Sequence, residues 1–232
     1  MLRDRLKSED YFDAFIKEDS LRVEKFDTKL RKNEVREDRI LPVKDGKNRI
    51  EIGLVIAKYS RGDSLSELKK EFTNILDEYI ELGTQGVTHG YSEALTFVSL
   101  AVLLESDKEQ LEKLATIDLH QDSLMNFLIN GKMTEEISNQ HLQIEDYKPL
   151  YNLVFLDDKE RQSEQLKTFV NDVWYKTNDE MGWYDSHKET KVNIYNGYWC
   201  FEAAAVAKLL DIPDNNLKDS QYYPYDLAHF EG

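Results

Sequence analysis

Histidines are the residues of this 232-residue chain best suited to acid–base or metal chemistry, and its five are scattered: His89, His120, His141, His187 and His229. None lies at helical spacing from a second histidine beside an acid, the pattern of zinc proteases. His187 and Asp185 are the nearest acid–base pair, and a polar pair in a loop is the simpler interpretation. Phosphate-binding Gly-rich loops and nucleophile elbows are also missing. We therefore predict no catalytic residue, no metal ligand and no cofactor.

Glu202 is the acidic residue with the least usual surroundings. It lies between Phe201 and Ala203 in the run Phe201-Glu202-Ala203-Ala204-Ala205-Val206, which we expect to form a buried helix. Because an isolated carboxylate is costly to bury, Glu202 needs hydrogen bonds from Tyr hydroxyls, a Trp N–H or a neighbouring cation. We interpret it as a polar tie between helices and not as a catalytic group.

Apolar residues recur at three- and four-residue steps along the N-terminal half, which predicts helices. A long helix over roughly 9–40 should end at Pro42 and Gly46. Further helices are expected at Ile50–Tyr59, after a capping box of Ser64 and Glu67, and at Tyr91–Leu104. Asp107 and Asp122 should cap two shorter helices.

The C-terminal half has the same helical character. Helices are predicted over Asp146–Leu156, Lys159–Tyr175 and 195–210, with a long aromatic loop over 176–194. Because 131–145 is polar and rich in turns, we expect an N-terminal helical domain at 1–130 and a C-terminal one at 140–232. The fold class is an all-α, multi-helix bundle of two packed helical subdomains, with any strand pairing confined to 42–48 or 184–194.

The chain also shows a weak internal similarity. Leu103-Leu104-Glu105 and Leu209-Leu210-Asp211 close two similar apolar helices. A pseudo-repeat and chance similarity between amphipathic helix pairs both explain it.

The formal net charge of −15 is unevenly distributed. Residues 51–150 hold 18 acidic and 8 basic side chains, and residues 177–232 hold 10 and 4, whereas residues 1–50 are slightly basic with 14 Lys/Arg against 12 Asp/Glu. Such a surface repels nucleic acid and attracts basic proteins, although solubility alone also explains it. We therefore expect no direct nucleic-acid binding. The charge pattern leaves the oligomeric state open.

The cellular location is expected to be the cytoplasm. Cys200 is the single cysteine and excludes an intramolecular disulfide, which fits a reducing compartment. No apolar segment follows the first five residues as in a signal peptide, and no window has the length of a membrane span.

Several short motifs resemble those of one bacterial family. They are Ile56-Ala57-Lys58-Tyr59-Ser60-Arg61-Gly62, Gly182-Trp183-Tyr184, Gly197-Tyr198-Trp199 before Phe201-Glu202-Ala203, and Tyr223-Pro224-Tyr225-Asp226-Leu227. This wording is similar to that of the PoNi-type immunity proteins, antitoxins that neutralise PoNe-type DNase toxins delivered to rival cells in interbacterial competition. The resemblance implies an all-α fold and inhibition instead of catalysis.

The C-terminal segment then becomes the expected contact surface for a basic nuclease toxin. The predicted partner-binding acids are Asp179, Glu180, Asp185, Asp214, Asp219 and Asp226. The residues expected to build the structural motif are Trp183, Tyr184, Tyr198, Trp199, Glu202, Tyr223, Pro224 and Tyr225. Two other functions are kept as alternatives: a helical adaptor for another basic protein, and an enzyme with a carboxylate site.

Overall fold

Helices and turns account for the secondary structure of the computed structural model, which describes residues 1–117 and 122–232. Those residues include no β-strand, so the expected all-α class is confirmed. His120 lies outside the described residues. Within them, no helix is both long and apolar enough to cross a membrane.

The described chain divides into two compact units. The first unit is Met1–Thr88 with Asp185–Gly197, and the second unit is His89–Tyr184 with Tyr198–Gly232. The compact units divide the chain at other positions than the domain limits expected from the sequence, 1–130 and 140–232. Those limits stay a prediction.

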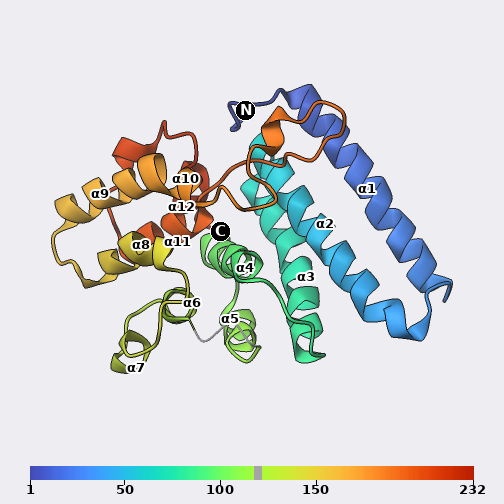
Figure 1. The fold of residues 1–232 in the computed structure, drawn as a ribbon, viewed down its shortest axis with the longest axis horizontal. Helices are drawn as coiled ribbons and strands as arrows, with labels where there is room; N and C mark the ends of the chain where they lie inside the picture. The colour runs from blue at the N-terminus through green and yellow to red at the C-terminus, as the bar shows by residue number, and fades with distance from the viewer. Residues whose placement is uncertain (118–121) are drawn as a thin grey trace. The chain divides into compact units, whose positions relative to one another are not determined.

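Three long helices build the first unit: α1 (Glu9–Arg31), α2 (Ile40–Arg61) and α3 (Leu65–Thr84). Figure 1 shows α2 between α1 and α3, and α2 packs against both. Short 3-10 turns precede α2 at Glu37–Arg39 (η1) and lie in the returning segment at Ser186–Lys188 (η5). Phe12, Val55, Phe72, Leu76 and Tyr79 are almost fully buried among the three helices.

Helix α1 is shorter than the predicted 9–40. Its start is as expected, since the Ser8 hydroxyl accepts the Tyr11 N–H at 3.3 Å. Its end is fixed by Asn33, which adopts a left-handed φ of 53°. The N–H groups of Asn33 and Glu34 return to the carbonyls of Leu30 and Lys29, which closes the last turn. Asn tolerates this conformation better than most residues, so it can replace glycine as a helix stop.

Helix α2 contradicts the predicted break at Pro42 and Gly46, because it runs through both. Pro42 is the third residue of the helix, where its missing N–H removes no intrahelical bond. Gly46 lies in the helix with open space around its α-carbon, so it weakens the helix without ending it. The separate helix expected at Ile50–Tyr59 is the second half of α2. At the next junction Ser64 precedes α3 as expected, but its hydroxyl makes no capping hydrogen bond.

The second unit is built around α4 (Tyr91–Leu103) and α11 (Phe201–Leu209), which pack closely together. Ala94 and Ala101 on α4 and the alanines of α11 are fully buried, and their small side chains allow this approach. The surrounding elements are α5 (Lys108–Leu114), α6 (Ser123–Asn130), α7 (Glu135–Ser138), η2 (Glu145–Tyr147), α8 (Lys148–Asn152), η3 (Leu153–Phe155), α9 (Lys159–Thr168), η4 (Phe169–Trp174), α10 (Tyr175–Thr177), η6 (Asn215–Leu217) and α12 (Tyr225–Ala228).

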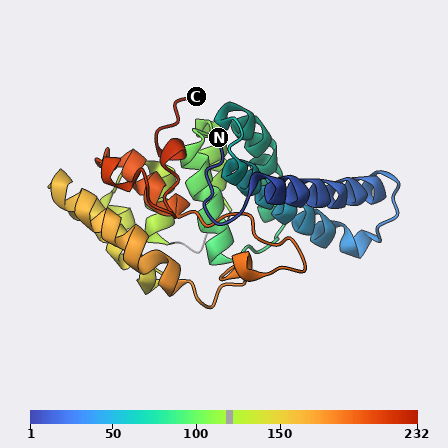
Figure 2. The ribbon, with the colours of Figure 1, turned by 90° about the horizontal axis from the view of Figure 1, so that it is seen from above.

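The predicted helix Lys159–Tyr175 is present but not uniform. Its second part, η4, is π-helical, and Figure 2 shows α9, η4 and α10 following one another as a continuous rod. The side chains of Asp107 and Asp122 cap α5 and α6 as expected.

The helix predicted at 195–210 begins only at Phe201. Gly197 has a φ of 123°, which breaks helical geometry, and the Cys200 N–H donates to the Tyr222 carbonyl at 2.8 Å. The Tyr222 carbonyl of the tail therefore accepts the N–H of Cys200, which would have donated within the helix if the helix had begun at 195.

The two helices of the internal similarity, α4 and α11, end in the same way. Glu105 after α4 and Asp211 after α11 have left-handed φ angles of 54° and 48°. In both, the N–H of the following residue reaches back five positions, from Ser106 to Ala101 and from Ile212 to Ala207. The pseudo-repeat itself stays a prediction.

Candidate functional site

Four of the six predicted partner-binding acids are exposed on the second unit: Asp179, Glu180, Asp219 and Asp226. Asp179 and Glu180 follow α10, whereas Asp219 and Asp226 lie in the C-terminal tail. These four carboxylates are accessible to a partner, and we call them the exposed acids.

Asp214 differs from the others because it is only 4% exposed. The Tyr223 hydroxyl donates to its Oδ2 at 2.7 Å, and the His229 Nε2 lies 2.8 Å from its Oδ1. Burial, followed by the charge of Asp214, raises the pKa of Tyr223 and keeps its proton on the phenol. Asp214 therefore joins two parts of the C-terminal tail, and its burial leaves little of the carboxylate at the surface. Its role in partner binding stays a prediction.

Asp185 belongs to the first unit, apart from the other five predicted acids. It has a left-handed φ of 58° and forms an ion pair with Lys188, with 2.6 Å between Oδ2 and Nζ. Much of its charge is therefore balanced locally.

The predicted structural motif surrounds an aromatic cluster centred on Tyr175. Tyr175 stacks on Tyr184 and Tyr222, with ring centroids 4.5 Å and 5.0 Å away. Trp183 stacks on Trp174 at 5.5 Å and lies 5.4 Å from Tyr198. These contacts connect the junction of η4 and α10, the loop after α10 and the C-terminal tail.

The remaining motif residues also fill the interior of the second unit. Tyr198, Trp199, Tyr223 and Pro224 are buried, and Tyr225 is half-buried with its hydroxyl 3.1 Å from Asn215 Oδ1. Large aromatic side chains of this kind stabilise a fold by their buried area.

Glu202 lies at the centre of a buried polar network. Glu202 is 6% exposed, and its side chain accepts a hydrogen bond from Trp174 Nε1 at 2.6 Å, with the polar side chains of Tyr147 and Cys200 beside it. Desolvation raises the pKa of Glu202 to about 7, although these donors lower it. Burial likewise raises the pKa of the Cys200 thiol, so this cysteine is protonated and unreactive at neutral pH.

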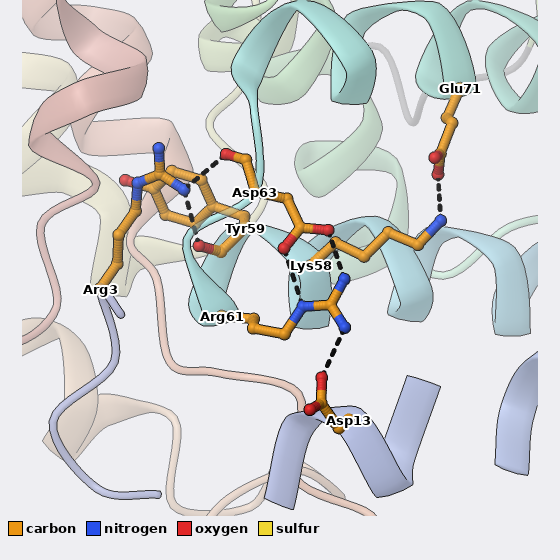
Figure 3. Close-up of polar contacts among 7 residues, drawn as sticks. All are labelled: Arg3, Asp13, Lys58, Tyr59, Arg61, Asp63 and Glu71. Carbon is orange, nitrogen blue, oxygen red and sulfur yellow. Dashed lines mark hydrogen bonds and ion pairs between the residues drawn. The ribbon is translucent and has the colours of Figure 1, made fainter. Parts of the chain in front are cut away.

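The N-terminal motif Ile56–Gly62 ties several parts of the first unit together (Figure 3). Arg61 holds Asp63 of the loop after α2 and Asp13 of α1, at 2.6 Å and 2.7 Å. The Arg3 guanidinium donates to the carbonyls of Tyr59 and Asp63, both at 3.0 Å. These contacts give Arg61 of the motif a structural role.

Gly62 and Ser60 complete this junction. Gly62 has a φ of 104°, and a Cβ there would lie 2.0 Å from the Met1 carbonyl oxygen, so only glycine fits. The Ser60 hydroxyl donates to the Asn196 carbonyl at 2.7 Å and so fastens the returning segment 185–197. That segment is also held by Tyr195, whose N–H donates to the Tyr11 hydroxyl at 2.9 Å and whose own hydroxyl bonds Asp4.

A charged cluster on the three helices of the first unit was not foreseen from the sequence. The amine of Lys47 on α2 lies 3.5 Å from Asp27 on α1, 3.3 Å from Glu51 on α2 and 3.0 Å from Glu78 on α3. The available signal was the spacing of Lys47, Glu51, Leu54 and Lys58, which places these four residues in one stripe along α2.

Comparisons with known proteins agree with the resemblance seen in the sequence. The model of the N-terminal part of PoNe immunity proteins (PoNi) matches residues 3–116, and the model of the C-terminal part matches residues 120–227. The crystal structure of protein PA2201 from Pseudomonas aeruginosa superimposes with a TM-score of 0.70 at 16% identity, covering 98% of this chain and 89% of that one, which shows a common fold. No match was found among curated proteins. The chain therefore belongs to the PoNi family of immunity proteins, which inhibit PoNe toxins and are not enzymes.

Proposed function

We propose that this immunity protein neutralises a PoNe-type DNase toxin by direct contact, and that the exposed acids of the second unit form part of the contact surface. A nuclease has to hold a polyanion, so the face of the toxin around its DNA site must be basic. An acidic protein binds such a face, either in the DNA site or beside it, and long-range attraction speeds the encounter.

The observation that carries this proposal is the stacking of Tyr175 on Tyr222, with an angle of 5° between the rings. Asp179 and Glu180 follow the first ring closely in sequence, and Asp219 and Asp226 lie on either side of the second. The stack therefore holds the two acid-bearing segments against each other. This gives the exposed acids a rigid support, which lowers the entropy lost when they meet a partner.

Co-expression in a test bacterium examines the function directly. A PoNe-type DNase toxin from the same genome is induced alone, with this chain, or with a PoNi protein from an unrelated toxin pair. We expect growth and intact chromosomal DNA only when this chain is present. Cell death in spite of full expression of this chain would contradict the proposed pairing with that toxin.

Purified proteins then test whether inhibition is by contact. This chain should form a stable complex with the nuclease-inactivated toxin domain in size-exclusion chromatography, and it should stop plasmid cleavage by the active domain at about one equivalent. Inhibition without complex formation would refute a binding mechanism. A complex that leaves cleavage unchanged would refute inhibition.

A further inference from the structure

We infer that the first unit carries a groove that binds a basic amphipathic segment of the toxin, and this inference rests on the proposed function. The groove runs over α2 between α1 and α3 and has a volume of about 300 Å³. The residues that line it include Val23 from α1, Glu51, Leu54 and Lys58 from α2, and Glu71 and Ile75 from α3.

The floor of the groove is apolar. Leu54 and Ile75 reach the surface there with 7% and 9% of their area exposed, and Val23 is half-buried on the α1 side. A short apolar floor of this kind suits one or two aliphatic or aromatic side chains of a partner. Burying their apolar surface there would contribute favourable free energy to binding.

The stripe of α2 that faces the groove is not covered by the returning segment 185–197. That segment meets α2 at Ser60, through the hydrogen bond to Asn196, and at Gly53, whose Cβ position lies 3.5 Å from the Asn196 side chain. Gly53 and Ser60 are seven residues apart and share a face of α2, and helical spacing directs them away from Leu54 and Lys58. The segment therefore fills one side of the helix layer and leaves the groove open on the other.

The rims of the groove are acidic. The amine of Lys47 forms ion pairs with Asp27, Glu51 and Glu78. Lys58 forms an ion pair with Glu71 at 2.6 Å (Figure 3). Glu51, Lys58 and Glu71 line the groove itself, two carboxylates against one ammonium group. Lys47, Asp27 and Glu78 adjoin it through Glu51 and bring the local total to four carboxylates and two ammonium groups, so negative charge is in excess. The pKa of Glu51 shows the same excess: desolvation raises it first, and Glu78 and Asp27 raise it further in spite of Lys47. An added lysine or arginine side chain would be attracted to this position.

The combination of an apolar floor and acidic rims selects the occupant. Nucleic acid and anionic membranes are repelled by the rims, whereas a helix or strand with apolar residues on one side and Lys/Arg beside them fits both features. A DNase toxin is a protein with such basic segments, because it binds DNA. The groove would act mainly on the lifetime of the complex, since anchors affect dissociation more than association.

Two exposed residues at opposite rims allow a test that leaves the core unchanged: Ser20 on α1 and Asn74 on α3, both of which line the groove. The double variant Ser20→Arg/Asn74→Arg adds bulk and positive charge. The double variant Ser20→Glu/Asn74→Glu adds similar bulk and negative charge. Ser66→Arg is the control, because Ser66 is an exposed residue of α3 on a different face of the helix.

Binding is measured with the nuclease-inactivated toxin domain by surface plasmon resonance, and folding by circular dichroism. We expect the Arg pair to weaken binding at least tenfold, and the Glu pair and Ser66→Arg to stay within about threefold of wild type. If the Arg pair binds the toxin as tightly as wild type does, the groove inference is overturned while the proposed function stands. Equal weakening of binding by the Arg pair and the Glu pair would have the same consequence. If the wild-type chain itself fails to bind the toxin, the proposed function fails first.

Sedimentation of the free chain tests the other occupant. We expect wild type and the Arg pair to have the same mass in solution. If wild type forms a dimer that the Arg pair dissociates, the groove is occupied by a second copy of this chain and the inference is overturned.

Discussion

Trp174 Nε1 donates a hydrogen bond of 2.6 Å to Glu202 Oε1 and so joins the π-helical segment η4 to α11. Trp174 also stacks on Trp183 and packs against Tyr222 at 5.5 Å. One indole ring therefore connects the central buried carboxylate of the second unit with the aromatic cluster that supports the exposed acids. A π-helical turn adds one residue to the helix period, which changes the direction of the side chains that follow it.

The first prediction concerns the stability contributed by Glu202. We expect Glu202→Ala to destabilise the protein by about 1–3 kcal/mol and Glu202→Leu to cost less. Both variants leave the Trp174 N–H without its acceptor, but only alanine also leaves a cavity. Chemical denaturation of the two variants and wild type measures the difference. An unchanged midpoint for Glu202→Ala would show that the buried network contributes nothing to stability.

The second prediction is a pH dependence caused by the same carboxyl group. Burial raises the pKa of Glu202 from 4.5 to about 7. Between pH 4.5 and 7 the unfolded chain has released this proton while the folded chain keeps it, so rising pH favours unfolding. The contribution of Glu202 to stability should thus decline by on the order of 3 kcal/mol across this window and remain constant above it.

Other acids change the total pH profile, so Glu202→Gln is the matched comparison. It keeps the shape of the side chain and cannot lose a proton. We expect the free energy of unfolding of wild type, minus that of Glu202→Gln, to fall as pH rises from 4.5 to 7. A constant difference over this range would mean that Glu202 titrates at its ordinary pKa.

The sequence was sufficient for the fold class because helical periodicity and the caps at Ser8, Asp107 and Asp122 depend on local residues. It failed where local signals compete with position. Pro42 normally ends a helix, but near a helix start its missing N–H removes no intrahelical bond. Tyr195–Cys200 looked helical, but the Tyr222 carbonyl, 22 residues after Cys200, takes the N–H of Cys200. A bond of that range leaves no periodic signal.

The candidate site was predictable in kind and less so in detail. The buried surroundings of Glu202 followed from its apolar neighbours. The burial of Asp214 did not, because it depends on Tyr223 and His229 meeting the carboxylate after the tail folds back. The groove in the first unit arises from three helices, and no single stretch of sequence contains its charge balance.

The third prediction compares one substitution at two glycines. Gly62→Ala should destabilise the protein by about 1–3 kcal/mol, because alanine disfavours a φ of 104° and its Cβ would collide with the Met1 carbonyl. Gly46→Ala should stabilise it by roughly 0.5–1 kcal/mol, because Gly46 is helical and has open space around it. Thermal melts of both variants test the pair. A stable Gly62→Ala protein would show that the N-terminal segment does not hold this position.

The final prediction concerns association with the toxin. Replacing Asp179, Glu180 and Asp219 by lysine should slow association by one to two orders of magnitude at low salt, because these exposed charges act through long-range attraction. The effect should shrink near 0.5 M salt, where the Debye length is about 4 Å. Stability should change little, since exposed charges contribute little to it.

The control is a triple lysine variant of Glu136, Asp146 and Asp172, exposed acids of the same unit with the same change in net charge. On-rates from surface plasmon resonance across a salt series compare the two. Equal slowing in both variants would assign the effect to total charge instead of to these three residues, and no slowing in either would place the toxin contact away from the exposed acids.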